Sequence, residues 1–167
     1  SGCSITTSGT NIVITNADVT FTGKFIKANF DLSGGNVVTM TSDGIRTGKT
    51  VSVLTGNTLT AAASLVTGKT IGGAGTVNVT ALESTLGADL SNITTTTLTG
   101  ALNSTDDKEF LAAAKLSDAV ITISGNGTVT ADASATLPTG SGSFSVGANA
   151  TLTLTAVHAD GLSASGS

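Results

Sequence analysis

Thr151-Leu152-Thr153-Leu154-Thr155 is the longest of several segments in which threonine alternates with an apolar residue. Shorter copies occur as Thr39-Met40-Thr41, Thr58-Leu59-Thr60 and Thr128-Val129-Thr130. Successive side chains of an extended strand point to opposite faces, so this alternation puts apolar groups on one face and hydroxyls on the other. Because threonine is β-branched, it suits a half-buried pleated surface, and Gly, Asn and Asp between the segments mark turns. The pattern therefore predicts short strands joined by turns.

Repetition along the chain indicates how these strands are arranged. Thr-Gly-Lys-Thr occurs at 47–50 and 67–70, and residues 70–77 match residues 122–129 at six of eight positions. Spacings of roughly 20–25 residues are typical of the coils of a parallel β-solenoid. We therefore predict an all-β chain folded as a parallel β-solenoid, with a β-sandwich as the alternative. The predicted strands are 11–15, 19–21, 25–32, 37–41, 50–54, 58–60, 75–80, 94–98, 120–124, 128–131, 142–146 and 150–155.

One alanine-rich stretch departs from the strand pattern. Residues 105–116 lack glycine, begin with Thr105 and Asp106 as capping residues, and carry Lys115 near their end. These features predict one short helix there. A weaker helical pattern covers 81–90. We expect a single domain over residues 1–167, with a sub-boundary near 100–118 where the helix interrupts the repeats.

Composition excludes several classes of protein. Lys and Arg number 7 against 11 Asp and Glu, a net charge of −4, so no cationic surface for nucleic acid is expected. No apolar run approaches the roughly 20 residues of a membrane span. The apolar fraction of 39% argues against disorder, whereas only 11% of residues are charged. Solubility must then come from hydroxyls and amides, a composition that favours an extracellular bacterial scaffold.

Several segments resemble a known class of repeats. Residues 73–82 and 87–95 (GAGTVNVTAL and GADLSNITT), 118–130 and 152–162 are similar to Thr/Gly-rich repeats of very large bacterial surface proteins, both S-layer-like and adhesin-like. The resemblance covers about residues 50–167. It implies an extended β scaffold outside the cell.

Binding motifs are incomplete in this sequence. A phosphate-binding loop needs a Gly separated from Gly-Lys-Thr by four residues, and at that position the two Thr-Gly-Lys-Thr segments have Asp43 and Ala63. Residues 72–80 have the glycine spacing of a calcium-binding β-roll, but Val77 occupies the position that needs a carboxylate. The densest acidic cluster, Asp106, Asp107 and Glu109, is a weak calcium candidate that helix capping also explains. We therefore expect no cofactor, with calcium as the one possibility left open.

Catalytic residues are not indicated either. His158 is the only histidine, beside Asp160, and no Gly-x-Ser-x-Gly segment accompanies it. Glu83 and Glu109 form the one carboxylate pair considered for glycoside hydrolysis, yet Trp and Tyr, which usually line sugar sites, are absent. Cys3 is the single cysteine and is either an incidental thiol or a residue modified or linked between chains. We expect that the chain is not an enzyme.

The expected function is structural. We predict a self-assembling β scaffold of a surface layer, adhesin stalk or filament, because the ends of a solenoid expose unpaired strand edges that can add another strand. A module that binds a surface glycan or host surface is the alternative, and an ice-binding solenoid is a minor one, because its Thr-x-Thr segments are unevenly spaced. The residues expected at the assembly interface are Val13, Phe21, Phe25, Phe30, Leu152 and Leu154.

Overall fold

The computed structural model describes most of the chain beyond residue 36 and four short segments before it. The described residues are 4–8, 11–15, 19–21, 29–32, 37–42, 45, 48–82, 85, 87–104, 111, 113–116, 119–138 and 142–167, with side chains from residue 37 onward except those of Thr96 and Ser104. Their elements are β1 (Ser4–Ser8), β2 (Asn11–Thr15), β3 (Val19–Phe21), β4 (Asn29–Leu32), β5 (Val37–Met40), β6 (Thr50–Val53), β7 (Thr58–Ala62), α1 (Ala63–Val66), β8 (Thr70–Thr80), β9 (Ile93–Ser104), β10 (Val120–Gly125), β11 (Thr128–Thr130), β12 (Ser143–Val146), β13 (Thr151–Thr153), α2 (Ala156–Ala159) and β14 (Ser163–Gly166).

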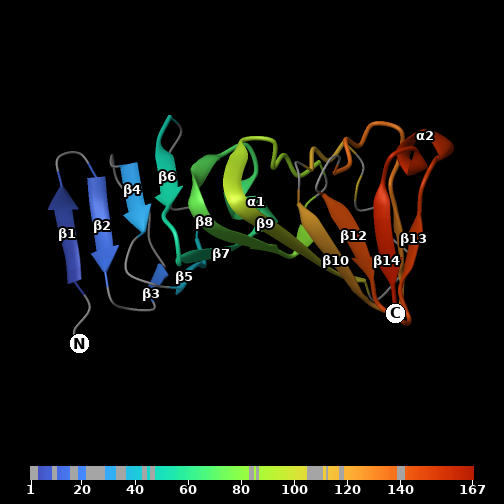
Figure 1. Ribbon diagram of the computed structural model, residues 1–167, viewed down its shortest axis with the longest axis horizontal. Helices are drawn as coiled ribbons and strands as arrows, with labels where there is room; N and C mark the ends of the chain where they lie inside the picture. The colour runs from blue at the N-terminus through green and yellow to red at the C-terminus, as the bar shows by residue number, and fades with distance from the viewer. Residues whose placement is uncertain are drawn as a thin grey trace.

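The fold is a parallel β-solenoid, as the sequence predicts. The strands stack along the long axis of the molecule, from β1 at one end to β14 at the other (Figure 1). Every described strand pair is parallel except β1 with β2, which form an antiparallel hairpin at the N-terminal end. This pairing rules out the sandwich alternative, whose strands would be antiparallel.

Equivalent residues of successive coils form columns in the interior. One such column runs through Met40, Ala61, Val79, Gly100 and Ile121, and all five are buried. Large and small side chains compensate each other along it: a Cβ at Gly100 would lie 2.5 Å from Ile121 Cδ1. Packing between coils, rather than within one strand, therefore fills the core.

Glycine and asparagine shape the corners between the sides of each coil. β8 serves two sides, since its first residues pair with β6 and its last with β7. It turns at Gly73, whose φ of +112° favours glycine, and a Cβ there would lie 2.3 Å from Val53 O. At the preceding corner, Asn57 is buried and its Nδ2 donates to the carbonyls of Leu54 and Thr55 at 2.9 and 3.1 Å.

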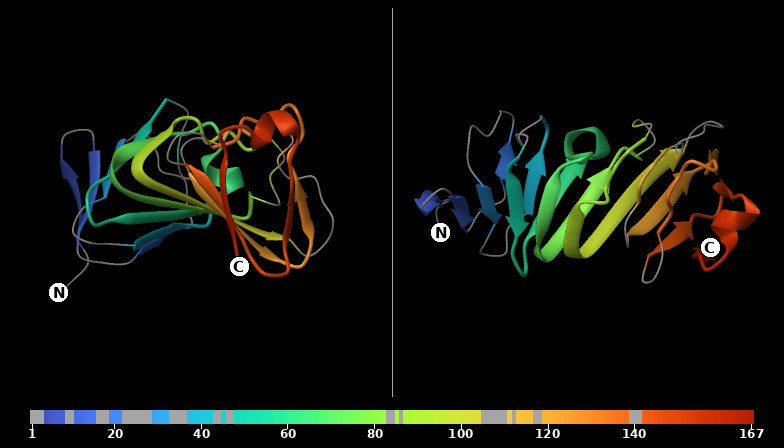
Figure 2. Two further views of the ribbon diagram at one scale, coloured as in Figure 1. Left: turned by 45° about the vertical axis from the view of Figure 1, so that its right-hand side comes forward. Right: turned by 90° about the horizontal axis from the view of Figure 1, so that it is seen from above.

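A third side of the solenoid consists of very short stacked segments, each of the form Ala-x-Leu. Asp89 pairs with Lys115, and Lys115 with Thr136, through parallel bridges. The flanking alanine and leucine side chains are all buried: Ala88, Leu90, Ala114, Leu116, Ala135 and Leu137. Figure 2 shows how these turns close the coils between the longer strands.

Most predicted strands are confirmed, whereas the predicted helix is wrong where it is described. Leu111 and 113–116 form a turn followed by the bridge at Lys115, and residues 105–110 lie outside the described part of the chain. The bridges to two neighbouring coils outweigh the helix propensity of the alanines. The helical pattern at 81–90 likewise ends in the bridge at Asp89. The two short helices occur instead at α1 and α2, and β1 and β14 were not predicted.

Candidate functional site

The outer face of the long strands carries two adjacent columns that are mostly threonine. Thr39, Thr60, Asn78 and Thr99 stack in register in one column, and Thr58, Thr76 and Thr97 stack in the other. All but Thr97 are half-buried. Thr99 Oγ1 donates to Asn78 Oδ1 at 3.0 Å, so neighbouring coils are also joined by side-chain hydrogen bonds. We call these seven residues the hydroxyl face.

A second pair of threonine strands lies outside this face. Thr128, Val129 and Thr130 of β11 pair in register with Thr151, Leu152 and Thr153 of β13, in a separate two-stranded sheet. Val129 is buried and Leu152 half-buried, as the alternation predicts. The Thr-x-Thr segments of the sequence therefore belong to two different sides of the solenoid.

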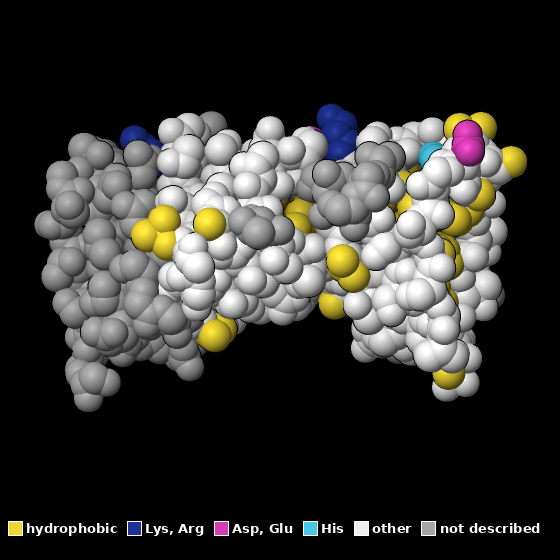
Figure 3. Space-filling model, viewed as in Figure 1, with side chains coloured by type: hydrophobic (Ala, Val, Ile, Leu, Met, Phe, Trp, Pro, Cys, Tyr) yellow, Lys and Arg dark blue, Asp and Glu magenta, His cyan; other side chains and the backbone are white. Residues whose placement is uncertain are grey.

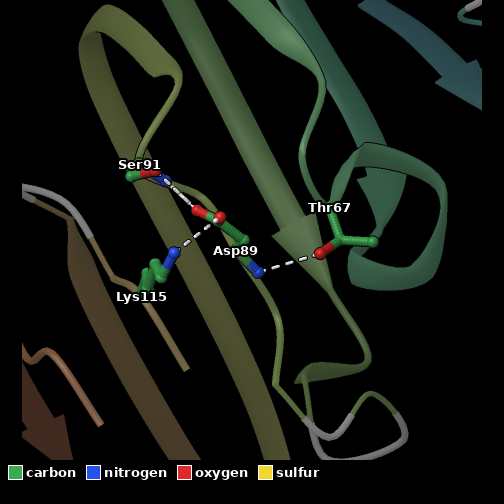
Figure 4. Close-up of polar contacts among 4 residues, drawn as sticks. All are labelled: Thr67, Asp89, Ser91 and Lys115. Atoms are coloured by element: carbon green, nitrogen blue, oxygen red, sulfur yellow. Dashed lines mark hydrogen bonds and ion pairs between the residues drawn. The ribbon is translucent and has the colours of Figure 1, made fainter. Parts of the chain in front are cut away.

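The charged group with the most described contacts lies on the Ala-x-Leu side, where Asp89 meets three neighbours (Figure 4). Its Oδ1 accepts hydrogen bonds from the backbone N–H and hydroxyl of Ser91, and its Oδ2 lies 3.4 Å from Lys115 Nζ. Its backbone N–H donates to Thr67 Oγ1 at 2.8 Å. The Ser91 hydroxyl, followed by the Ser91 N–H and the Lys115 ammonium, lowers the pKa of Asp89 despite some desolvation. This group joins three successive coils.

The second Thr-Gly-Lys-Thr segment, at 67–70, is a corner of the solenoid. Gly68 has a φ of +66°, and its N–H donates to Asp89 O at 2.8 Å. Lys69 Nζ donates to Ile45 O of the preceding coil at 2.6 Å. The lysine and the glycine thus contact protein groups above and below them.

Of the two calcium sites considered from the sequence, only the one at Val77 can be compared with the structure. Val77 is wholly buried in the core, so it does not face a cation. The acidic cluster of Asp106, Asp107 and Glu109 lies outside the described residues. Within the described part, no three His, Cys, Asp or Glu side chains lie together as a metal-binding group.

The residues considered for catalysis in the sequence do not all lie in the described part of the chain. His158 lies in α2, where its Nε2 is 3.0 Å from Ala135 O; since a carbonyl only accepts, this nitrogen donates. Its Nδ1 is buried and has no hydrogen-bond partner among the described residues. Asp160 follows α2 and is exposed, whereas Glu83 and Glu109 lie outside the described residues. The histidine ring thus contacts the coil beneath it.

The predicted assembly residues fall at both ends of the stack. Val13, Phe21 and Phe30 belong to β2, β3 and β4, whose backbones are described, whereas Phe25 lies outside the described residues. Leu152 and Leu154, at the other end, are half-buried and pack against the core. Their role in assembly remains a prediction.

Sequence reasoning missed the Ala-x-Leu side and the Asp89 group. The repeated signal was present as Ala-Asp-Leu, Ala-Lys-Leu and Ala-Thr-Leu at 88–90, 114–116 and 135–137. Three residues are too short for a strand prediction from alternation, so only the stacking of coils reveals their equivalence.

The described residues include no helix with the length and apolarity to cross a membrane. Comparison with known proteins finds no match to a family model, to a curated protein or to a solved structure.

Proposed function

We propose that this chain is a structural element of an extracellular bacterial assembly, a β-solenoid scaffold that extends a surface layer, stalk or filament. The observation that carries the proposal is the uninterrupted order of paired strands from β1 through β2, β4, β6, β8, β9, β10 and β12 to β14. Each coil contacts mainly its neighbours, so the architecture can be lengthened without redesigning its core.

The surface suits packing in a dense assembly. Figure 3 shows few charged side chains over the described part of one face. With 11% charged residues and a net charge of −4, copies of the chain repel one another weakly. Hydroxyl groups keep such a surface hydrated while leaving it free to contact other copies. The same composition supports an extracellular location.

Self-association is the mechanism we propose for this scaffold, and electron microscopy tests it. The purified chain should form filaments or lattices in negative stain, whereas a chain lacking residues 1–30 should keep its far-UV β signal without forming them. A control lacking only residues 1–3 removes Cys3 and should still assemble. Equal assembly of the chain without residues 1–30 would contradict a role of the N-terminal strands.

Ice binding is a second candidate, favoured by the hydroxyl face. Uneven spacing in the sequence argued against it, but the structure aligns Thr39, Thr60 and Thr99 in one column although their sequence spacing is unequal. Neighbouring strands are about 4.8 Å apart, and alternate residues of a strand repeat about every 7 Å on one face. Such a two-dimensional array of hydroxyls and methyls is a surface that can order water. Asn78 interrupts it in the central coil.

Thermal hysteresis and ice recrystallisation measure this second activity. Thr97→Lys places a charged chain on an exposed position of the hydroxyl face and should abolish any hysteresis. Thr136→Lys, also at an exposed threonine but on the Ala-x-Leu side, should leave it unchanged. Absence of hysteresis in the unsubstituted chain would dismiss ice binding and leave the scaffold proposal intact.

A further inference from the structure

The two short helices occupy equivalent corners of the solenoid. In both, a strand with a Thr-Leu-Thr segment leads into the helix. A glycine with positive φ then ends the corner, and a new strand begins. Thr60, Ala63, Gly68 and Thr70 recur at one constant offset as Thr153, Ala156, Gly161 and Ser163. Gly68 and Gly161 have φ values of +66° and +74°.

Each helical corner has a side chain that binds the coil beneath it. After α1, Lys69 Nζ donates to Ile45 O at 2.6 Å. In α2, His158 Nε2 donates to Ala135 O at 3.0 Å. In each case a side chain donates a hydrogen bond to a backbone carbonyl of the preceding coil, although Lys69 follows α1 whereas His158 lies within α2. The equivalence of the two corners therefore rests on their sequence order and backbone conformation.

The upper side of the α1 corner is covered by the next coil. Gly68 N–H donates to Asp89 O at 2.8 Å, and Thr67 Oγ1 accepts from Asp89 N–H at 2.8 Å. These two bonds hold the Ala88-Asp89-Leu90 segment against the corner in parallel register. The strand after the helix, β8, is likewise covered by β9.

The upper side of the α2 corner has no such cover among the described residues. β14 pairs with β12 alone, and Ala164, which continues the buried inward column of Ile121 and Phe144, is exposed. Val157 is 83% exposed. Figure 3 shows apolar side chains gathered toward this end of the molecule. The last coil therefore presents core positions and an open strand edge.

We propose that this C-terminal end is a docking surface for one further parallel β-coil. Gly161 N–H would donate to a carbonyl of that coil, as Gly68 does to Asp89, and the Asp160 carboxylate would accept the adjacent N–H in place of Thr67 Oγ1. The outer edge of β14 continues the ladder, and an Ala-x-Leu segment of the incoming coil covers the corner. Continuity with the α1 interface identifies the partner as a coil of this type.

This inference rests on the proposed scaffold function but specifies its surface and polarity. An extended chain tests it, in which residues 1–161 are followed directly by residues 69–167. The junction at Gly161 then repeats the natural sequence after Gly68. The extended chain should unfold in a single cooperative transition, and the Gly161 amide should exchange its hydrogen about a hundredfold more slowly than in the unextended chain.

Variants at Asp160 separate docking from a general effect on folding. In the extended chain, Asp160→Thr reproduces the α1 corner and should keep the Gly161 amide protected, whereas Asp160→Ala should weaken that protection. In the unextended chain, the two substitutions should behave alike. An appended segment that unfolds separately and leaves Gly161 unprotected would overturn the proposal.

Self-association of the unextended chain gives an independent outcome. If Gly161 becomes protected as the unextended chain associates, while the appended coil of the extended chain unfolds separately, a second copy occupies this surface in another arrangement and our assignment to a parallel coil is wrong. If no filaments form but the extended chain folds as one unit, the scaffold proposal loses its self-assembly step, while the docking surface stands.

Discussion

Asn57 shows how much a single corner residue contributes in a protein with so few charges. It is the buried polar side chain of the described core, 1% exposed, and its amide donates to the carbonyls of Leu54 and Thr55. The backbone carbonyl of Asn57 accepts a hydrogen bond from Thr76 N–H at 2.9 Å, which joins the corner to β8. A buried amide with satisfied partners fixes one corner conformation, because each unmade hydrogen bond would cost desolvation.

We expect Asn57→Ala to lower the free energy of unfolding by about 1–3 kcal/mol, because the buried side-chain amide and its hydrogen bonds to the carbonyls of Leu54 and Thr55 are lost. Asn57→Asp should cost more, since it turns a carboxylate toward carbonyl oxygens. Urea denaturation measures both. Asn126→Ala, at an exposed turn, is the control and should change stability by no more than about 0.5 kcal/mol. Equal effects at Asn57 and Asn126 would contradict the structural role of the buried amide.

Asp89 predicts a pH dependence of stability. Its pKa is lowered in the folded chain, chiefly by the Ser91 hydroxyl, so folding favours the carboxylate. The contribution is therefore fully present above the unfolded pKa of about 3.9 and is lost as pH falls through the lower folded value. Removing the group by Asp89→Asn should cost about 1 kcal/mol at neutral pH, a modest amount because Lys115 is largely exposed.

Denaturation at a series of pH values checks this prediction. The stability difference between the unsubstituted chain and Asp89→Asn should shrink as pH falls below about 4. Ser91→Ala, which removes the main cause of the lowered pKa, should reduce the same pH dependence without removing the carboxylate. A difference that stays constant across this range would show that Asp89 does not titrate with folding.

At the scale of elements, the corners distinguish glycines that a coil requires from those that it merely tolerates. Gly56 and Gly73 both have positive φ, +78° and +112°. A Cβ at Gly56 has nothing within 4 Å, whereas at Gly73 it would lie 2.3 Å from Val53 O, a backbone atom that cannot rotate away. A side chain at either position would therefore have to adopt an unfavourable backbone conformation, but only at Gly73 would it also collide with a neighbouring strand.

Gly56→Ala should therefore cost about 1–2 kcal/mol, the penalty of a left-handed conformation for a side chain. Gly73→Ala should cost at least about 2 kcal/mol more, because overpacking against β6 is added to that penalty. Thermal unfolding of the two variants gives the comparison. Equal losses would mean that the bend of β8 can move away from Val53.

Strands were predictable from sequence because their signal is local, whereas the third side was not. In β6 the alternation of buried and outward-facing residues follows the apolar and polar alternation of the sequence, and in β5 and β7 only Val37 and Ala62 depart from it. Leu111–Leu116 misled the helix prediction because its alanines suit a helix equally well. Only the bridges of Lys115 to Asp89 and Thr136 decide between the two structures, and those partners lie in other coils.

The hydroxyl face shows the same limit for the candidate site. The segments at Thr39 and Thr58–Thr60 were recognised in the sequence, whereas Thr97-Leu98-Thr99 was not, and the register between coils was not predicted. Thr39 stands beside Thr60 rather than Thr58, and Thr128 stands beside Thr151 on a different side. Sequence offsets alone could not align these residues, because corners such as Gly73–Gly75 insert irregular lengths between strands.

At the scale of the whole molecule, stability is expected to depend on interfaces between neighbouring coils. A solenoid coil contacts little beyond the coils above and below, so the chain should tolerate removal of one coil if the remaining register is preserved. Deleting residues 116–136 joins Lys115 to Leu137 and keeps the Ala-x-Leu corner. It also lets β12 take the place of β10 on top of β9. Phe144 would then lie above Gly100, where Ile121 lies in the full chain.

We expect this deletion to leave a cooperative fold with lower stability, since one coil interface is lost and Phe144 packs into the space above Gly100. Circular dichroism during thermal unfolding and limited proteolysis measure the outcome. Deleting residues 116–126 instead removes part of a coil, joins Lys115 to Gly127 and leaves β11 without its corner, so it should abolish the cooperative transition beyond residue 115. If both deletions fold equally well, or neither folds, the coils are not equivalent units, and a scaffold that lengthens coil by coil is not supported by this chain.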